Sequence, residues 1–361
     1  MGRLALAGLL LLGANALPLF AVENDECLAC HSDPELVKVL PNGDTLSLFV
    51  DEEKFAASVH GINELSCTDC HSDIEELNYD AEVPHPVPLQ PVDCSMCHDE
   101  EAEAYAQSIH AQLREAGKDA PSCAQCHAYH YTKYLYADNV QDLENKFCLR
   151  CHDPYRFHAW LPQKATHFRH VMCTVCHAEG VSPQVHLRVF DRKSDRFVPG
   201  HELLQVLNLS EDEFLETYDA NSNGILDLTE LEHLKAALHG KGIHAVFFGE
   251  MGVELTPEVH RVTKAKAVQT CESCHQPGAT NLQQVVFVLS KPTGEAEFFE
   301  VDPKVLTSPE VSNFYLLNAT RIPLLDRIGL VVLFLGLAFA LGHGVLRLLT
   351  SPLRRKKGEK S

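Results

Sequence analysis

The chain has 361 residues and carries 50 Asp and Glu residues against 30 Lys and Arg residues, a net charge of −20 at pH 7. An acidic balance of this size argues against nucleic acid as a partner. The length would ordinarily indicate two or three domains, and the 14 cysteines call for a covalent cofactor, a disulfide framework or zinc sites.

One five-residue pattern, Cys-x-x-Cys-His, occurs seven times and uses every cysteine. Two thiols at this spacing can form thioethers to the two vinyl groups of one haem, and the adjacent histidine then binds the iron. A disulfide framework does not require these histidines, and tetrahedral zinc would need four ligands from pairs of such units. The sequence therefore predicts seven covalent haem c groups, held by Cys27/Cys30/His31, Cys67/Cys70/His71, Cys94/Cys97/His98, Cys123/Cys126/His127, Cys148/Cys151/His152, Cys173/Cys176/His177 and Cys271/Cys274/His275.

Histidines outside the motifs are candidates for the second axial ligand that a low-spin electron-transfer haem needs. Fourteen such histidines are present, enough for seven haems. His60 and His110 each follow a serine and an apolar residue upstream of a motif, and this repeat favours both as ligands. His167 and His170 share a helical face and could point to two neighbouring irons, with His158 in reserve. The expected second ligands are His60, His85, His110, His130, His167, His170 and His260.

The chain divides by composition into five segments. Residues 1–21 have an early Arg3, an apolar run and small residues before Val22, as expected of a secretory signal peptide. We expect a hexahaem region at 22–181, an insert with the seventh motif at 182–322, a transmembrane helix at 323–350 and a basic cytoplasmic tail at 351–361. Six haems leave no room for six conventional cores, so the predicted fold is mainly α with extensive loops packed around the haems.

The insert is expected to contain two β-hairpins and a calcium loop. Apolar runs at 185–190 and 285–289 are each followed by a polar turn and a second short run, which indicates hairpins that could share one small sheet. Between them, residues 219–230 resemble an EF-hand loop with Gly224 at its sharp turn. Its expected ligands are Asp219, Asn221, Asn223, the carbonyl of Ile225, Asp227 and Glu230. A single hand without a Met-rich groove indicates one structural Ca²⁺ ion rather than a sensor.

The C-terminal segment predicts a membrane anchor. Residues 328–346 are apolar except for His343, and this length is close to that needed to cross the hydrocarbon layer. Basic residues at 354–357 follow, so we expect a cytoplasmic C-terminus and a periplasmic haem domain at the inner membrane. Gly336, Ala340 and Gly344 form a small-residue stripe suited to helix contacts. His343 beside this stripe would form an inter-helix hydrogen bond, bind a partner's haem b or contact a quinone.

These motifs resemble those of multihaem c-type cytochromes, and the layout is similar to the seven-haem, C-terminally anchored subunits of bc-type menaquinol oxidoreductase complexes in metal-respiring bacteria. The resemblance implies a separate membrane b-type cytochrome, carrying haem b, that oxidises menaquinol. It also implies that this subunit relays the electrons to periplasmic c-type cytochromes in anaerobic respiration. Residues 22–105 hold 21 acidic residues and two lysines, a bias that would steer a basic partner. The seventh motif, nearest the membrane in sequence, is the expected point of electron input.

An enzyme is the alternative interpretation. A multihaem reductase of nitrite, hydroxylamine or a sulfur oxyanion would need one iron without a second protein ligand. All seven motifs end in histidine, without the Cys-x-x-Cys-Lys variant that a nitrite reductase would show. A simple quinol dehydrogenase with an N-terminal anchor fits less well, because the anchor here is C-terminal.

Overall fold

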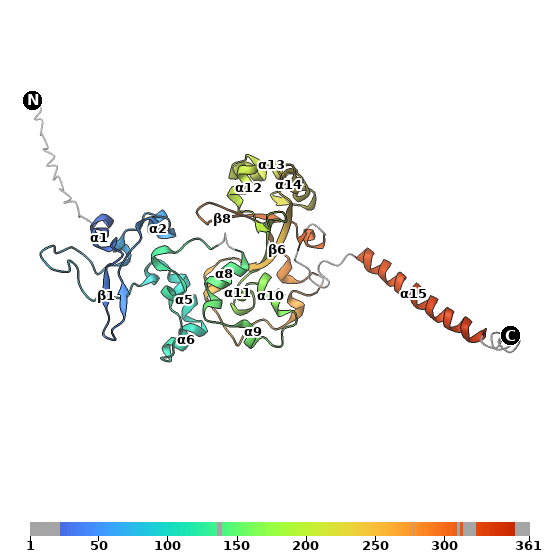
Figure 1. Ribbon diagram of the computed structural model, residues 1–361, viewed down its shortest axis with the longest axis horizontal. Coiled ribbons are helices and arrows are strands. Elements are labelled where there is room, and N and C mark those ends of the chain that lie inside the picture. Colours follow the sequence, from blue (N-terminus) through green and yellow to red (C-terminus); the bar gives the residue numbers. More distant parts are fainter. Residues whose placement is uncertain (1–21, 136–138, 277, 309–310, 313–322, 351–361) are drawn as a thin grey trace, which may run out of the picture. The chain divides into compact units, whose positions relative to one another are not determined.

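The computed structural model describes residues 22–135, 139–276, 278–308, 311–312 and 323–350 (Figure 1). The chain forms two compact units. The first consists of residues up to Asp99 together with His127–Lys133, and the second of Glu100–Cys126 and the chain from Tyr134 onward. This division differs from the one expected at 181/182, and it falls inside the fourth motif. The predicted signal peptide and basic tail lie outside the described residues.

The first unit is built from short elements. Hydroxyl and carboxylate caps begin several of its helices: Ser58 and Ser66, for example, accept the backbone N–H of Gly61 and Asp69. A small antiparallel hairpin pairs Val37 with Ser47. The elements are α1 (Asn24–His31), β1 (Val37–Val39), β2 (Thr45–Ser47), α2 (Glu52–Ala56), α3 (Val59–Ile62), α4 (Cys67–Cys70), η1 (Cys94–Met96) and η2 (Tyr129–Tyr131).

The side chains of the first unit do not form an apolar core. Among its described residues only Ser58 is buried, and that polar side chain caps α3. Helices α1 to α4 bury no residue. A segment of this size ordinarily folds by burying apolar surface. The first unit must therefore be stabilised by something other than the packing of its own side chains.

The second unit contains a seven-stranded sheet, so the expectation of a mainly α fold is wrong for this part of the chain. The strand order is β5-β8-β7-β3-β6-β9, with β4 paired to β3. Strands β3 and β6 are antiparallel over nine residues, and β7 runs parallel to β3. The strands are β3 (Pro183–Asp191), β4 (Arg196–Phe197), β5 (Ile225–Leu226), β6 (Ala245–Val253), β7 (Val285–Ser290), β8 (Ala296–Val301) and β9 (Val311–Ser312).

Helices cover both sides of this sheet. In Figure 1, α12 to α14 lie on one side of β6 and β8, while α8, α10 and α11 lie on the other. The helices of the second unit are α5 (Asp99–Ala106), α6 (Ile109–Glu115), α7 (Cys123–Cys126), α8 (Val140–Lys146), α9 (Pro154–Phe157), α10 (Lys164–His170), α11 (Cys173–His177), α12 (Gly200–Leu207), α13 (Glu211–Tyr218) and α14 (Leu228–Gly240). Short 3₁₀ turns are η3 (Cys148–Arg150), η4 (Pro257–His260), η5 (Cys271–Ser273), η6 (Thr280–Leu282) and η7 (Pro303–Thr307).

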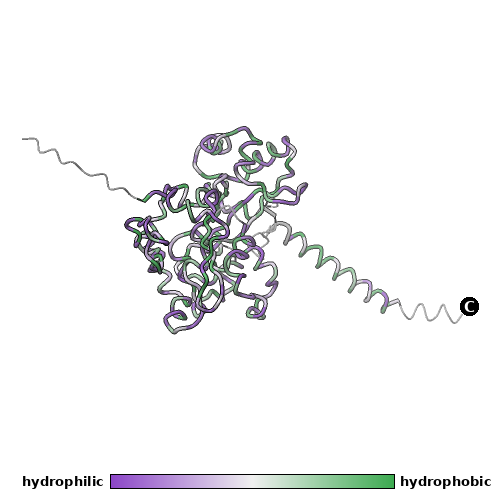
Figure 2. The backbone as a smooth tube through the Cα atoms, turned by 60° about the vertical axis from the view of Figure 1, so that its left-hand side comes forward, coloured by the Kyte–Doolittle hydropathy of each residue, from purple (hydrophilic) through white to green (hydrophobic). Residues whose placement is uncertain are grey.

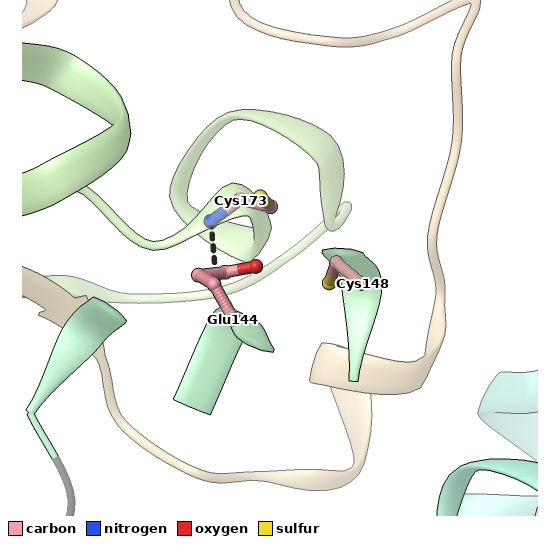
Figure 3. Close-up of side chains that lie close together, drawn as sticks. All are labelled: Glu144, Cys148 and Cys173. Atoms are coloured by element: carbon pink, nitrogen blue, oxygen red, sulfur yellow. Dashed lines mark hydrogen bonds between the residues drawn. The ribbon is translucent and has the colours of Figure 1, made fainter. Parts of the chain in front are cut away.

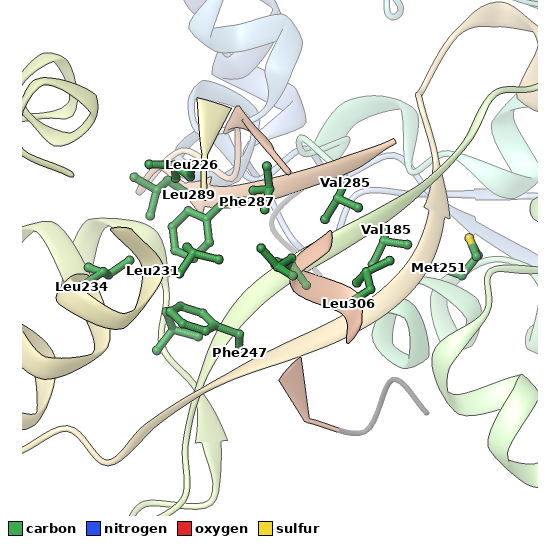
Figure 4. Close-up of a cluster of buried hydrophobic side chains, with 14 of the residues drawn as sticks. Val185, Leu226, Leu231, Leu234, Phe247, Met251, Val285, Phe287, Leu289 and Leu306 are labelled. Atoms are coloured by element: carbon green, nitrogen blue, oxygen red, sulfur yellow. The ribbon is translucent and has the colours of Figure 1, made fainter. Parts of the chain in front are cut away.

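The apolar core of the second unit lies between the sheet and α12 to α14 (Figure 4), and it continues on the other side of the sheet with Leu143 of α8 and Val175 of α11. Phe214 of α13 stacks on Phe287 of β7, with ring centroids 5.6 Å apart. Leu231, Leu234 and Leu238 repeat at helical spacing along α14 and are fully buried. Each such side chain contributes about 1.5–3 kcal/mol when removed from water. This unit therefore has a conventional protein core, which the first unit lacks.

Strand β6 connects the core to the motif-bearing segments. Met251 accepts the backbone N–H of Met172, directly before the sixth motif, at 2.9 Å. Glu250 accepts the backbone N–H of Val140 at the start of α8 with its Oε1, at 3.2 Å. The sheet therefore fixes the positions of both α8 and the beginning of α11.

The C-terminal helix α15 (Pro323–Leu349) contains the predicted membrane span. Residues Arg327–Leu349 are long enough and apolar enough to cross a membrane. Figure 2 shows the helix as a largely hydrophobic tube. This supports a single-pass anchor near the C-terminus.

Three polar side chains share one buried face of β3 and β6. His186 lies opposite Glu250 in the antiparallel register, and Arg188 is two residues further along β3. The Arg188 Nε and a Glu250 carboxylate oxygen are 3.5 Å apart. Burial lowers the pKa of His186 to about 3, with a further contribution from Arg188, and burial raises the pKa of Glu250 to about 7 against the opposing charge of Arg188.

The buried imidazole predicts a pH-dependent stability. His186 takes up a proton in the unfolded chain below a pKa of 6.5 but stays neutral when folded down to about 3. The contribution of His186 to the free energy of unfolding is therefore fully present above pH 6.5. It is lost as the pH falls, by about 1.4 kcal/mol for each pH unit. Glu250 has the opposite sign, because its stabilising effect is present below pH 4.5 and is lost as the pH rises toward 7.

We predict that His186→Gln reduces the pH slope of the free energy of unfolding between pH 6.5 and 5, measured by denaturant titration and circular dichroism. The control is His233→Gln, because His233 is exposed on α14. Glu250 is present in all three proteins, so its contribution cancels in the comparison. Equal slopes in wild type and His186→Gln would contradict the prediction.

Candidate functional site

Each Cys-x-x-Cys-His motif forms about one helical turn. In four motifs the histidine N–H donates to the carbonyl of the first cysteine: His71 at 2.9 Å, His98 at 3.0 Å, His152 at 2.9 Å and His275 at 2.7 Å. Residues three and four apart lie on one side of such a turn. Both thiols and the imidazole of a motif therefore project toward the same side. None of the 14 cysteines, all of which lie among the described residues, forms a disulfide bond.

The motif cysteines differ in how far the polypeptide covers them. Cys30 and Cys151 are exposed, whereas Cys27 and Cys148 of the same two motifs are half-buried. The backbone gives the reason. Cys30 lies on α1, which buries no residue, and Cys151 follows the last residue of η3 as its C-cap. The exposed cysteines are Cys30, Cys94, Cys97, Cys123, Cys151 and Cys271.

The predicted attachment of haem at Cys30 and Cys151 is compatible with the exposure of both residues. Thioether formation depends on the spacing of the two thiols and on their access to the vinyl groups, and exposure does not impair either. These two residues therefore remain predicted attachment points, at the surface of the polypeptide rather than inside it.

Six motif histidines each face a second histidine. The ring centroids are 5.8 to 6.3 Å apart in every pair. Because a bond from a metal to an imidazole nitrogen is about 2 Å long, two imidazoles on opposite sides of one metal ion have centroids about 6 Å apart. The spacing therefore fits a metal with two axial imidazoles. The pairs are His31–His85, His60–His98, His71–His130, His110–His152, His158–His177 and His167–His275.

Five of the seven expected second ligands occupy these pairs, namely His60, His85, His110, His130 and His167. The sixth pair uses His158, the residue held in reserve, instead of His170. His170 packs on Phe248 of β6 with ring centroids 5.2 Å apart, and its Nδ1 is buried without a hydrogen bond. His170 and His260 are not brought to a motif histidine in any of the six pairs. His127, the fourth motif histidine, is half-buried.

Backbone carbonyls orient many of these imidazoles. The Nδ1 atoms of His31, His158 and His177 lie 2.7, 2.9 and 3.1 Å from the carbonyls of Leu48, Pro154 and Thr263. A carbonyl only accepts, so Nδ1 carries the proton and Nε2 keeps its lone pair for a metal. The same arrangement occurs at His60, His85, His167 and His260.

Burial favours the neutral imidazole that a metal ligand requires. It lowers the pKa of His71 and His130 in the first unit and of His110 and His275 in the second. In each case the paired or nearby histidines lower the pKa further. These side chains are therefore available as neutral ligands at neutral pH.

The cysteines show which motifs are neighbours in the first unit. Burial raises the pKa of Cys67 to about 11, and the adjacent Cys27 thiol raises it too. Burial also raises the pKa of Cys70, with contributions from Asp69 and Cys97. Motif two therefore lies beside both motif one and motif three.

The cysteines also show which motifs are neighbours in the second unit. Burial raises the pKa of Cys126, which is also affected by Cys148. Ligand atoms of Cys148 and Cys173 lie within 4.8 Å of each other. Burial raises the pKa of Cys176 to about 11, with Cys274 contributing. Motifs four to seven thus follow one another in space, and the seventh lies beside the sixth although more than 90 residues separate them in sequence.

A buried carboxylate that sequence reasoning missed stands between the fifth and sixth motifs (Figure 3). Glu144 is 4% exposed, and its Oε1 accepts the backbone N–H of Cys173 at 2.7 Å. Its ligand atom lies within 4.8 Å of those of Cys148 and Cys173. The sequence feature that could have predicted this arrangement is a Glu four residues before a motif cysteine, because residues at that spacing share a face within a helix.

The predicted calcium loop lies between two helices, α13 and α14. Asp219 and Glu230 are 7% and 3% exposed, although both carry carboxylates. Asp219 accepts the backbone N–H groups of Asn223 and Gly224 at 3.1 and 2.7 Å, and Gly224 has a φ of +79° that suits glycine.

Further contacts close the loop at its other end. Glu230 accepts N–H groups of Asn221 through Oε1 and of Asp227 through Oε2, while Asp227 caps α14. Ile225 begins β5, the strand at one edge of the sheet, which pairs with β8. The polar groups expected as ligands therefore gather around one short turn that is fastened to the sheet.

One comparison with known proteins finds a family that is similar to part of the chain. Residues 53–128 match the family model described as cytochrome c7 and related cytochrome c. This stretch holds the second, third and fourth motifs together with His60 and His110. No curated protein and no solved structure matches the chain. Residues 53–128 are therefore similar to multihaem cytochromes c, a family that carries covalent haem c, and this similarity supports electron transfer as the role of the chain.

A ligand replacement within the matched stretch tests the imidazole pairs. We predict that His60→Ala leaves His98 as the one protein ligand of a haem iron and opens the opposite axial position. One haem equivalent should become high-spin in the oxidised protein and bind carbon monoxide when reduced, as measured by electron paramagnetic resonance and visible spectroscopy. His233→Ala, which alters an exposed histidine outside the pairs, should leave both spectra unchanged. A fully low-spin His60→Ala protein with complete haem content would contradict the assignment.

Proposed function

We propose that the chain is a heptahaem cytochrome c, anchored in the inner membrane and facing the periplasm, that relays electrons from a quinol-oxidising b-type cytochrome to periplasmic c-type cytochromes. The six imidazole pairs carry this proposal. Haem supplies one-electron chemistry when bound, and two imidazole ligands leave the iron no open position for a substrate. The pairs therefore favour a relay over an enzyme.

The residues of this chain have separate tasks in such a relay. The motif cysteines fix each haem to one helical turn, and the second histidines come from other segments of the same unit. His31 and His85, for example, are separated by the whole second motif. Such cross-connections hold neighbouring haems at fixed positions. The closeness of Cys148 to Cys173 and the effect of Cys274 on the pKa of Cys176 support short electron-transfer steps through motifs five, six and seven.

The surroundings of the relay suggest its direction. Helix α15 belongs to the C-terminal part of the second unit and would anchor that unit to the membrane. The seventh motif ends the succession of motifs in that unit, and we assign electron input there. The first unit carries most of the acidic excess of residues 22–105, and we assign docking of a basic periplasmic cytochrome to it.

The alternative is a multihaem reductase of nitrite, hydroxylamine or a sulfur oxyanion. That activity requires an iron with an open axial position. The six imidazole pairs oppose this at six of the seven motifs. We therefore place the reductase second.

Electron paramagnetic resonance of the oxidised full-length protein tests the relay. We expect low-spin signals that account for all seven haems, with haem content confirmed by mass spectrometry. A stoichiometric high-spin signal would replace the relay by the reductase.

The same protein, extracted in mild detergent from its own membranes, tests the partner. We expect a haem b subunit and menaquinol oxidation to co-purify with it. Quinol oxidation by the isolated chain alone would overturn the assignment of a separate b-type cytochrome.

We further propose that the loop between α13 and α14 binds one structural Ca²⁺ ion as an EF-hand. Hard cations of this kind prefer carboxylate, amide and carbonyl oxygens. Two nearly buried carboxylates, Asp219 and Glu230, support the proposal, because each costs free energy to bury unless a cation or donors compensate its charge. In paired hands such a loop meets a second loop, whereas here Ile225 and Leu226 pair with β8. The ion would therefore stabilise the edge of the sheet rather than signal.

Calcium removal should lower the melting temperature of the second unit in the wild-type protein. At a hundredfold excess over its dissociation constant, a bound ion contributes about 2.7 kcal/mol. Glu230→Gln should abolish most of the difference between calcium and chelator, while Glu232→Gln, an exposed neighbour on α14, should preserve it. Identical wild-type melting curves with calcium and with chelator would contradict the calcium site.

A further inference from the structure

The Glu144 carboxylate occupies an unusual position. It is 4% exposed, one oxygen accepts the Cys173 N–H at 2.7 Å, and the other oxygen is buried without a hydrogen-bond partner. A buried carboxylate with an unsatisfied oxygen is costly, and such a group needs an explanation. Glu144 also stands beside two cysteines from successive motifs, Cys148 and Cys173 (Figure 3).

The fold holds this carboxylate in place from several sides. Glu144 lies on α8, whose first residue Val140 donates its N–H to Glu250 of the sheet. Leu143 of the same helix is buried in the core. Cys148 follows four residues after Glu144 and begins η3. The carboxylate therefore cannot swing into solvent without moving α8.

A resident metal ion does not explain this cluster. Glu144, Cys148 and Cys173 place their ligand atoms within 4.8 Å of one another, as a metal site would. However, both cysteines belong to haem-attachment motifs, and thioether sulfurs neither bind a cation as thiolates do nor donate a hydrogen bond. Once the haems are attached, Glu144 remains a carboxylate directly beside two attachment points.

We propose that Glu144 is a positioning and tuning residue for the fifth and sixth haems, which lowers the midpoint potentials of both through its negative charge. This inference rests on the proposed haem attachment at Cys148 and Cys173. A negative charge in a poorly solvated site stabilises the ferric state of nearby iron over the ferrous state. One carboxylate placed between two motifs acts on two haems together, so it lowers both potentials. Its hydrogen bond to Cys173 separately fixes the start of α11.

The two roles can be separated by substitution in the full-length detergent-solubilised protein. Glu144→Gln retains an oxygen that can accept the Cys173 N–H but removes the charge. Glu144→Asp retains the charge but has a shorter reach to that N–H. Asp142→Asn removes one charge from an exposed position on the same helix and serves as the matched control.

Spectroelectrochemical titration gives the decisive measurement. In Glu144→Gln we expect two haem equivalents to shift to more positive potentials, with the haem content and melting temperature of the wild type. Glu144→Asp should melt at a lower temperature without that positive shift, and Asp142→Asn should titrate as the wild type does.

Two results would overturn the proposal. A Glu144→Gln titration that superimposes on the wild-type curve, with all haems present, would leave Glu144 a purely structural role and would not affect the relay. Mass spectrometry showing no haem on the wild-type peptides with Cys148 or Cys173 would instead reject the attachment on which both proposals depend. Haem content and potential therefore distinguish the two failures.

Discussion

The placement of a second imidazole opposite each of six motif histidines is the constraint on which the rest of the structure depends. The distance of about 6 Å across a metal leaves little tolerance, and each pair joins segments that are separate in sequence. In the first unit this constraint has to replace ordinary packing, because Ser58 is the one buried residue among those described. His31–His85, His60–His98 and His71–His130 cross-connect nearly every segment of that unit. In the proposed heptahaem cytochrome, axial ligation and covalent attachment would therefore be folding interactions in this unit as well as electronic ones.

In the second unit, an apolar protein core helps to hold the histidine pairs in place. Its sheet and the helices α12 to α14 form an apolar core around Phe214, Phe247 and Phe287. Strand β6 connects this core to the motifs. Glu250 accepts a hydrogen bond from the start of α8, and Met251 accepts one from the residue before α11. Histidine pairs in this unit are thus supported by a framework that does not depend on them. The two units should differ in how far each needs its prosthetic groups to fold.

The sequence predicted what local chemistry determines. The helical turns of the motifs were predictable because their cysteines and histidine are three and four residues apart. The loop between α13 and α14 was predictable from the spacing of its Asp, Asn and Gly residues. Five of the histidines that face a motif histidine were among the expected second ligands, two of them through the Ser-apolar-His repeat. The helical face shared with His167 favours His170 over His158, but Phe248 of β6 packs against His170. Strand β6 itself escaped prediction, because it is buried on both faces and contains Gly249 and Gly252, so no alternation marks it.

The position of the seventh motif shows why sequence separation misleads in such a chain. More than 90 residues divide it from the sixth, and this suggested a haem set apart beyond an insert. In the structure Cys274 lies near enough to Cys176 to raise the pKa of that buried thiol, and His167 from before the sixth motif faces His275. The intervening sheet returns the chain to the region of the sixth motif. Strand β3 leads away from that motif, and β6 runs back antiparallel to β3 over nine residues. The insert therefore brings the seventh motif back beside the sixth. The apolar core of the insert determines how these two motifs lie relative to each other.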